Sequence, residues 1–334
     1  MSETTIMDRQ SLIPYMREYE EKFTDSGLVR WLPYLMYFHP TSHVSPVVNT
    51  DSFGFRYTEK DKRNFSVAEH NSAPGYKLLA GSSTVFGIGA SQDRWTLSSC
   101  MSERDPDGAR WINFGGRSFN STQELQLLTL YHQHLPKIDE IVLFSGFNNL
   151  GLARQPAAMR GDNGAFFNCH TFFEALESKN SRGLRWPFQN KPQTVSESVP
   201  GMEQQIAFAS ELTLNHLTVW QAMANMLGAK ITYILQPLSG WVRDKGSVEE
   251  EIIFAELDEI GGFSQQYGDI LKYEVCEEYA RQLQKGADKL DIPFINSSPL
   301  IRNAIKEDEW MFVDRIHFTD YGHDKVSQII LDSI

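Results

Sequence analysis

The chain has 334 residues, of which 41% are hydrophobic and 12% aromatic, and its formal net charge is -12 at pH 7. This length and composition fit one large α/β domain with elaborations, or two domains, and the acidity argues against nucleic acids and anionic membranes as partners. Three widely spaced cysteines form neither a disulfide framework nor a Cys-x-x-Cys metal site. No apolar run is long enough to span a membrane, and residues 1–20 carry charges throughout, so we expect a cytoplasmic protein.

Residues 1–74 precede the first regular pattern of strands and helices. The amphipathic stretch 11–23 predicts a helix. It is followed by an aromatic run at 31–38, which proline interrupts, and by a turn between extended pieces at 47–56. No linker rich in Gly, Ser or Pro separates this part from the rest. We therefore expect an N-terminal extension packed on the main domain, in preference to a separate binding module.

From residue 75 to 334, short apolar strands alternate with helix-like stretches. The predicted strands are 76–80, 111–114, 141–144, 231–235 and 292–295, and the predicted helices are about 121–135, 201–228, 269–289 and 320–334. Such alternation predicts a five-stranded, mostly parallel sheet covered by helices on both faces. The expected fold is thus a flavodoxin-like three-layer α/β/α sandwich.

Two stretches of this domain, about 150–200 and 237–264, exceed the usual lengths of connections. Arg154 and Arg185 lie among aromatic residues in the first, and Trp241 lies in the second. We expect these three side chains to contact a polar or anionic substrate that also has an apolar part. Either stretch can be a lid or a surface insertion, and the sequence leaves both interpretations open.

The segment 80–87, Ala-Gly-Ser-Ser-Thr-Val-Phe-Gly, follows the first predicted strand. It places Ser83 beyond the carboxyl end of a buried strand and at a helix N-terminus, where open sheets bind ligands and free N–H groups stabilise an oxyanion. Ser83 is therefore a candidate nucleophile. The alternative is an ordinary turn whose hydroxyls cap a helix.

An Asp-x-x-His motif, Asp314 and His317, precedes the last predicted helix. An aspartate three residues before a histidine can hold one imidazole nitrogen and leave the other free to take a proton from a serine. The alternative is a surface turn with a helix cap at Thr319. Asp320 and His323 have the same spacing, but they fall within the helix, where a salt-bridged surface pair is expected.

Two further strand ends carry groups that can stabilise a negative charge. Gly146 and Asn148 follow the third strand, and the sequence Asn-Phe-Gly-Gly-Arg-Ser at 113–118 ends the second. An asparagine side chain and backbone N–H groups are suitable oxyanion donors, although each segment taken alone also fits a plain turn.

In order and residue type, these segments resemble the SGNH hydrolase family, also called GDSL-like lipases and acylhydrolases. That family has a Gly-Asp-Ser block, a glycine block after the second strand, a Gly-x-Asn block after the third and a terminal Asp-x-x-His. The corresponding residues here are Gly81-Ser82-Ser83, Asn113-x-Gly115, Gly146-x-Asn148 and Asp314-x-x-His317. The resemblance extends over about 76–330.

The resemblance implies that Ser83 is the nucleophile and that its own N–H lies in the oxyanion hole. It also implies that Asn148 donates from its side chain, that His317 is the base and that Asp314 orients His317.

The chain departs from the family pattern at two positions. Ser82 replaces the usual aspartate, which resembles a Gly-Ser-Ser variant of the first block, and Ser118 stands where the second block usually has its glycine. Either the backbone N–H of Ser118 or, in a shifted turn, that of Gly116 would be the remaining oxyanion donor.

The expected activity is that of a serine ester hydrolase that acts on a small-molecule or carbohydrate ester through an acyl-enzyme, with no metal or organic cofactor. An acyltransferase with the same residues is one alternative, and a catalytically inactive binding protein is another. A Gly-x-Ser-x-Gly elbow, a dinucleotide fingerprint and a phosphate-binding Gly-Lys-Ser/Thr loop are all missing from the sequence. The oligomeric state stays open.

Overall fold

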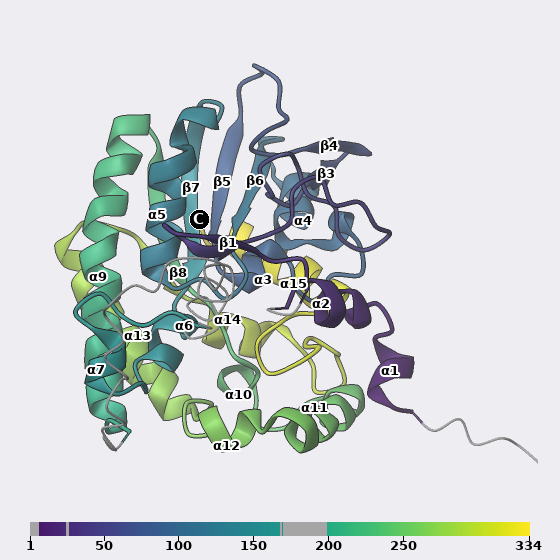
Figure 1. Ribbon diagram of the computed structural model, residues 1–334, viewed down its shortest axis with the longest axis vertical. Coiled ribbons are helices and arrows are strands. Elements are labelled where there is room, and N and C mark those ends of the chain that lie inside the picture. The colour runs from purple at the N-terminus through teal and green to yellow at the C-terminus, as the bar shows by residue number, and fades with distance from the viewer. Residues whose placement is uncertain (1–6, 25–26, 168, 170–198) are drawn as a thin grey trace, which may run out of the picture.

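The structure is a computed structural model that describes residues 7–24, 27–167, 169 and 199–334. At its centre is a sheet of five parallel strands in the order β6-β5-β7-β8-β9 (Figure 1). They are β5 (Tyr76–Gly81), β6 (Arg110–Gly115), β7 (Ile138–Ser145), β8 (Lys230–Leu235) and β9 (Phe294–Asn296). Each overlaps the strand predicted at its place, and the predicted α/β fold class is confirmed.

Both faces of this sheet are apolar and buried. In β7, Ile141 and Leu143 belong to one buried cluster, whereas Val142 and Phe144 belong to the other. A strand that is covered on both sides must be apolar at successive positions, which explains the continuous apolar runs in the sequence. The core therefore consists of two parts, one on each face of the sheet.

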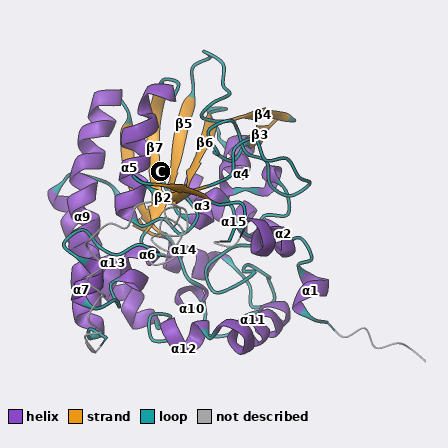
Figure 2. Ribbon diagram, viewed as in Figure 1, coloured by secondary structure: helices purple, strands orange, loops and turns teal. Residues whose placement is uncertain are grey.

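Two groups of helices cover the two faces of the sheet and complete these two parts of the core (Figures 1 and 2). One face packs against α5 (Ser121–Tyr131), α9 (Met202–Leu227) and α13 (Tyr273–Lys289). The other packs against α4 (Leu97–Arg104), α14 (Ser297–Ala304) and α15 (Asp320–Leu331). The four predicted helices are thereby confirmed, the first ending in a 3-10 turn, η2 (His132–His134). Short helices follow two of the strands along the chain: α3 (Ser83–Phe86) comes after β5, and α6 (Phe147–Leu152) and α7 (Ala157–Arg160) come after β7.

The single helix predicted over 11–23 is wrong, because the segment forms two short helices. α1 (Arg9–Leu12) ends before Pro14, and α2 (Met16–Lys22) begins after it. A proline inside a helix removes a backbone donor and collides with the preceding turn, so the chain breaks there.

The segment 237–264 is mostly helical and is not a long irregular connection. It contains α10 (Ser239–Val242), α11 (Val248–Gly261) and α12 (Phe263–Tyr267). Ile253 and Phe254 of α11 are buried in the core, so this segment is part of the packed domain.

The N-terminal extension contains two small antiparallel strand pairs that lie outside the main sheet (Figure 2). They are β1 (Arg30–Leu32) with β2 (Met36–Phe38), and β3 (Thr58–Lys60) with β4 (Arg63–Phe65). Its aromatic side chains enter both cores, with Phe38 and Phe55 in one and Tyr19 and Phe23 in the other. The extension therefore contributes side chains to the buried apolar clusters on both faces of the sheet.

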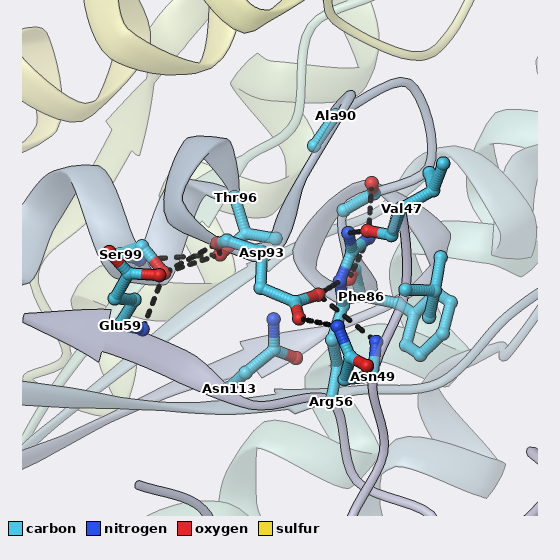
Figure 3. A network of polar contacts seen from close by, with 12 residues as sticks. Val47, Asn49, Arg56, Glu59, Phe86, Ala90, Asp93, Thr96, Ser99 and Asn113 are labelled. Carbon is cyan, nitrogen blue, oxygen red and sulfur yellow. Dashed lines mark hydrogen bonds and ion pairs between the residues drawn. The ribbon is translucent and has the colours of Figure 1, made fainter. Parts of the chain in front are cut away.

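A buried arginine joins this extension to helix α3. Arg56 is fully buried, and its Nε donates to Asp93 Oδ1 at 2.7 Å, in η1 (Asp93–Trp95). Its Nη1 donates to Gly87 O and to the Tyr19 hydroxyl, each at 2.8 Å. Its Nη2 donates to Val47 O at 2.7 Å (Figure 3). The guanidinium thus satisfies carbonyl groups at the carboxyl end of the helix that begins with Ser83.

A buried carboxyl group lies between α5 and β7. Glu124 is 4% exposed and accepts a hydrogen bond of 2.6 Å from Ser145 Oγ. Burial, opposed in part by this hydrogen bond, raises the pKa of Glu124 to about 8. The carboxyl group is therefore protonated in the folded protein at neutral pH, whereas in the unfolded chain it ionises near its ordinary value.

This difference predicts a stability that falls with rising pH. Between about pH 4.5 and 8 the folded state holds a proton on Glu124 that the unfolded state has lost. Over this range the free energy of unfolding therefore falls by about 1 kcal/mol per pH unit. Glu124→Gln keeps an acceptor for Ser145 without a titrating group, so its stability relative to the natural protein should rise from pH 5 to pH 8. Urea unfolding of both proteins at these pH values tests this. Parallel pH dependences would contradict it.

Candidate active site

The turn after β5 positions Ser83. A side chain on Gly81 would collide with the Phe144 carbonyl of the neighbouring strand, so glycine is required where the chain leaves the sheet. Ser82 is then the N-cap of α3, and Ser83 is its first residue, 6% exposed. Its hydroxyl lies at the carboxyl edge of the parallel sheet, as the sequence predicted.

Ser83, His317 and Asp314 form a continuous chain of hydrogen bonds. Ser83 Oγ lies 2.7 Å from His317 Nε2, and His317 Nδ1 lies 2.7 Å from Asp314 Oδ2. The other oxygen, Oδ1, accepts the backbone N–H groups of Ile316 and His317, each at 2.7 Å. Because an ionised carboxylate can only accept, Nδ1 carries the proton and Nε2 is free to accept from the serine hydroxyl.

The surroundings of Asp314 keep it ionised. Burial acts to raise its pKa, but His317 and the backbone N–H groups of Ile316 and His317 outweigh burial, so the pKa of Asp314 lies below its ordinary value. A negative charge is therefore available next to the imidazole at neutral pH, where it stabilises an imidazolium.

The rival pair Asp320 and His323 does not form the predicted surface salt bridge. His323 is fully buried, packs edge-on against Phe318 and has a pKa lowered to about 3 by burial. Asp320 instead accepts hydrogen bonds from the backbone N–H and hydroxyl of Ser91. The prediction was wrong because this side of α15 faces the core.

Asn148 lies on α6, and its side-chain amide is next to the turn that follows β6. It is 7% exposed, and its Nδ2 donates to Phe119 O at 2.6 Å. That bond uses one amide hydrogen and fixes the side chain. The second amide hydrogen has no partner within the ranges that the structure describes, so it can donate to a developing oxyanion.

Of the two backbone donors considered for the second block, Gly116 is excluded. Its N–H donates to Gly81 O at 3.0 Å and is therefore engaged within the protein. Ser118 has a left-handed backbone with φ of 58°. Its N–H has no acceptor in the described part of the chain, so Ser118 remains the candidate.

The three proposed substrate contacts have different outcomes. Trp241 is fully buried, and its indole N–H donates to Ile270 O at 2.7 Å, so the prediction that it contacts a substrate is wrong. Arg154 is paired with Asp269 at 2.6 Å, and its contact with substrate stays a prediction. Arg185 lies outside the described residues.

Removal of the Asn148 amide should slow turnover strongly. On the hypothesis that Asn148 is an oxyanion donor of an ester hydrolase, we expect Asn148→Ala to lower kcat about a hundredfold or more with little change in KM, because such a donor acts mainly in the transition state. Kinetics with a chromogenic acetate ester, normalised to folded protein, measure this effect.

Asn149 supplies a matched control for that substitution. Its Nδ2 donates to Ser121 Oγ and Thr213 Oγ1, each at 2.7 Å, so its amide has a structural role. Asn149→Ala should lower stability with little change in kcat. Equal kcat losses in the two variants would rule out a specific role for Asn148.

Among the residues that the structure describes, no cluster of three or more His, Cys, Asp or Glu side chains is arranged to hold a metal ion. Nor does any described helix combine the length and apolar character needed to cross a membrane.

No family model matches the chain, and no curated protein matches it. Among solved structures, it is similar to an extracellular lipase from Streptomyces rimosus, at 12% identity and a TM-score of 0.45, over 78% of this chain and 100% of that one. It is also similar to a lipase/acylhydrolase from Enterococcus faecalis, at 14% identity and a TM-score of 0.40, over 78% and 94% of the two chains. A third is the acetyl xylan esterase AlAXEase, at 11% identity and a TM-score of 0.43, over 78% and 99%.

Proposed function

We propose that the chain is a serine ester hydrolase of the SGNH type, which removes an O-acyl group from a small molecule or a carbohydrate. The observation that carries this proposal is the chain of 2.7 Å contacts from Ser83 Oγ through His317 to Asp314. A serine hydroxyl is a weak nucleophile until a neighbouring base takes its proton. This geometry supplies the base, its orienting carboxylate and the correct tautomer.

The proposed reaction begins with attack of Ser83 Oγ on the ester carbonyl carbon, while His317 Nε2 takes the hydroxyl proton. The negative charge moves to the carbonyl oxygen, which the Ser83 N–H, the Asn148 amide and the Ser118 N–H stabilise. When the tetrahedral intermediate collapses, the bond to the alcohol breaks and His317 gives its proton to the departing oxygen. The acyl group is then bound to Ser83.

A water molecule completes the cycle. It loses a proton to His317 Nε2 and attacks the acyl carbon. The bond between that carbon and Ser83 Oγ then breaks, His317 returns the proton to Oγ, and the acid leaves. Asp314 stays ionised throughout and stabilises the imidazolium. If a sugar or another alcohol attacked in place of water, the same residues would perform acyl transfer.

A fluorophosphonate probe tests the activated serine. We expect one covalent adduct on the folded protein, mapped to Ser83 by peptide mass spectrometry and lost in His317→Ala. Product analysis with acetate esters, with and without acceptor alcohols, then distinguishes hydrolysis from transfer. If the folded protein is neither labelled by the probe nor active on any ester, the proposal fails and a binding role on this fold is favoured.

A further inference from the structure

The backbone conformation of Ser118 needs support from elsewhere. The turn 116–119 is closed by a 3.1 Å hydrogen bond from Phe119 N–H to Gly116 O, and Ser118 is its third residue, at φ of 58°. A positive φ at this position of a turn favours glycine, because a side chain there is strained. A serine keeps this conformation only if its surroundings hold it.

Tyr37 holds the carbonyl side of Ser118. Its hydroxyl donates to Ser118 O at 3.0 Å, and its ring lies 5.9 Å from that of Phe119, centroid to centroid. The side chain is 1% exposed and comes from β2 of the N-terminal extension. A buried hydroxyl on a rigid ring fixes the direction of the carbonyl that it binds.

His39 fixes the peptide unit on the other side, because it binds the N–H of Arg117. Its Nε2 accepts the Arg117 N–H at 3.0 Å, and its Nδ1 lies 3.0 Å from Gly54 O. A carbonyl oxygen cannot donate, so Nδ1 carries the proton and Nε2 is the acceptor. The ring also stacks on Phe86, the last residue of α3, with centroids 3.8 Å apart.

Two further hydrogen bonds place this turn beside the candidate site. Gly116 N–H donates to Gly81 O, two residues before Ser83, and Phe119 O accepts from the Asn148 amide. The peptide unit that carries the Ser118 N–H therefore lies between the serine turn and α6. Its two neighbouring polar groups are those held by His39 and Tyr37.

We propose that Tyr37 and His39 are positioning residues of the oxyanion hole, which hold the Arg117–Ser118 peptide so that its N–H points at the developing oxyanion. This inference rests on the proposed function. It gives the N-terminal extension a part in the reaction, because β2 compensates for a serine at a position that suits glycine. Neither residue contacts the reacting atoms.

A double-mutant cycle between Tyr37 and Ser118 tests the inference. Tyr37→Phe keeps the buried ring and removes the hydroxyl, and we expect kcat to fall about tenfold or more with KM nearly unchanged, since small displacements of catalytic groups have large effects. Glycine adopts a positive φ without strain. In the Ser118→Gly background, Tyr37→Phe should therefore have little effect on kcat.

Tyr76→Phe is the matched control. Tyr76 is also 1% exposed in a strand, and its hydroxyl donates to Asn71 Oδ1 at the opposite end of β5. We expect this variant to lose some stability and no kcat per titrated active site. If Tyr37→Phe lowers only the melting temperature, like the control, or if its kcat loss is the same in both Ser118 backgrounds, the inference is wrong.

Labelling and ester hydrolysis by the natural protein show whether the proposed function fails or only the inference about Tyr37 and His39. If it is neither labelled by fluorophosphonate nor active on esters, the proposed function fails, and the inference falls with it. If it is active but indifferent to Tyr37→Phe, the inference alone fails.

Discussion

Ser83→Ala is expected to lower the rate of ester hydrolysis about a thousandfold or more and to leave the protein folded. Under the proposed function, Ser83 Oγ forms the bond to the acyl group, and no other hydroxyl is held by His317 Nε2 in the described structure. The loss of its hydrogen bond costs about 1 kcal/mol, too little to unfold a domain of this size. Single-turnover kinetics with a chromogenic acetate ester measure the effect.

The neighbouring serine is the matched control. Ser82 Oγ donates to Gln236 Oε1 at 3.3 Å, and no contact joins it to His317 in the described structure. Ser82→Ala should therefore keep both hydrolysis and the fluorophosphonate adduct. Ser83→Ala with activity within tenfold of the natural protein would assign the reaction to another group.

Asp93→Ala should destabilise the fold by about 3–5 kcal/mol. Arg56 is 0% and Asp93 6% exposed, and their atoms are 2.7 Å apart, so the substitution leaves a buried guanidinium without its countercharge. The same carboxylate also accepts the Asn49 amide at 2.6 Å, which would lose its partner (Figure 3). Urea or thermal unfolding measures the change, and the recovery of folded protein should fall.

A surface pair of the same residue types provides the comparison. Arg104 and Asp324 are 2.6 Å apart, but their side chains are 41% and 31% exposed. Asp324→Ala should cost less than about 1 kcal/mol, because solvent screens exposed ion pairs. If the two substitutions have equal effects, the buried pair has no special role in joining the extension to α3.

The main sheet was predictable because its strands are buried on both faces and therefore appear in the sequence as apolar runs. The break between α1 and α2 also has a local cause, which is Pro14. The amphipathic pattern on both sides of this proline led to the prediction of one continuous helix. Helix α11 was missed, yet signals for it exist: Ser247 and Glu250 form a capping box, and Gly262 adopts the left-handed conformation just beyond its last turn.

The candidate site was predictable to the extent that its groups follow strand ends. Ser83 and Asn148 follow strand ends, which meet at one edge of a parallel sheet. Asp314 and His317 precede α15 instead, and their Asp-x-x-His spacing predicted them; the structure brings them into contact with Ser83. The assignments of Trp241 and Gly116 failed for reasons that depend on the tertiary structure and leave no pattern in the local sequence. Trp241 is buried in the core, and the N–H of Gly116 donates to Gly81 O. The hydrogen bond from Tyr37 to Ser118 joins residues that are 81 positions apart, and no sequence motif predicts it.

The order of these groups along the chain has a consequence for biosynthesis. Ser83 follows β5, the first strand of the main sheet, whereas its hydrogen-bond partner His317 comes 234 residues later, just before α15. A ribosome therefore exposes the serine long before the imidazole exists. Without that base the hydroxyl is only a weak nucleophile toward esters. Under the proposed function, a nascent chain that lacks His317 has no activated serine, and reactivity toward esters begins when the segment that leads into α15 packs beside Ser83.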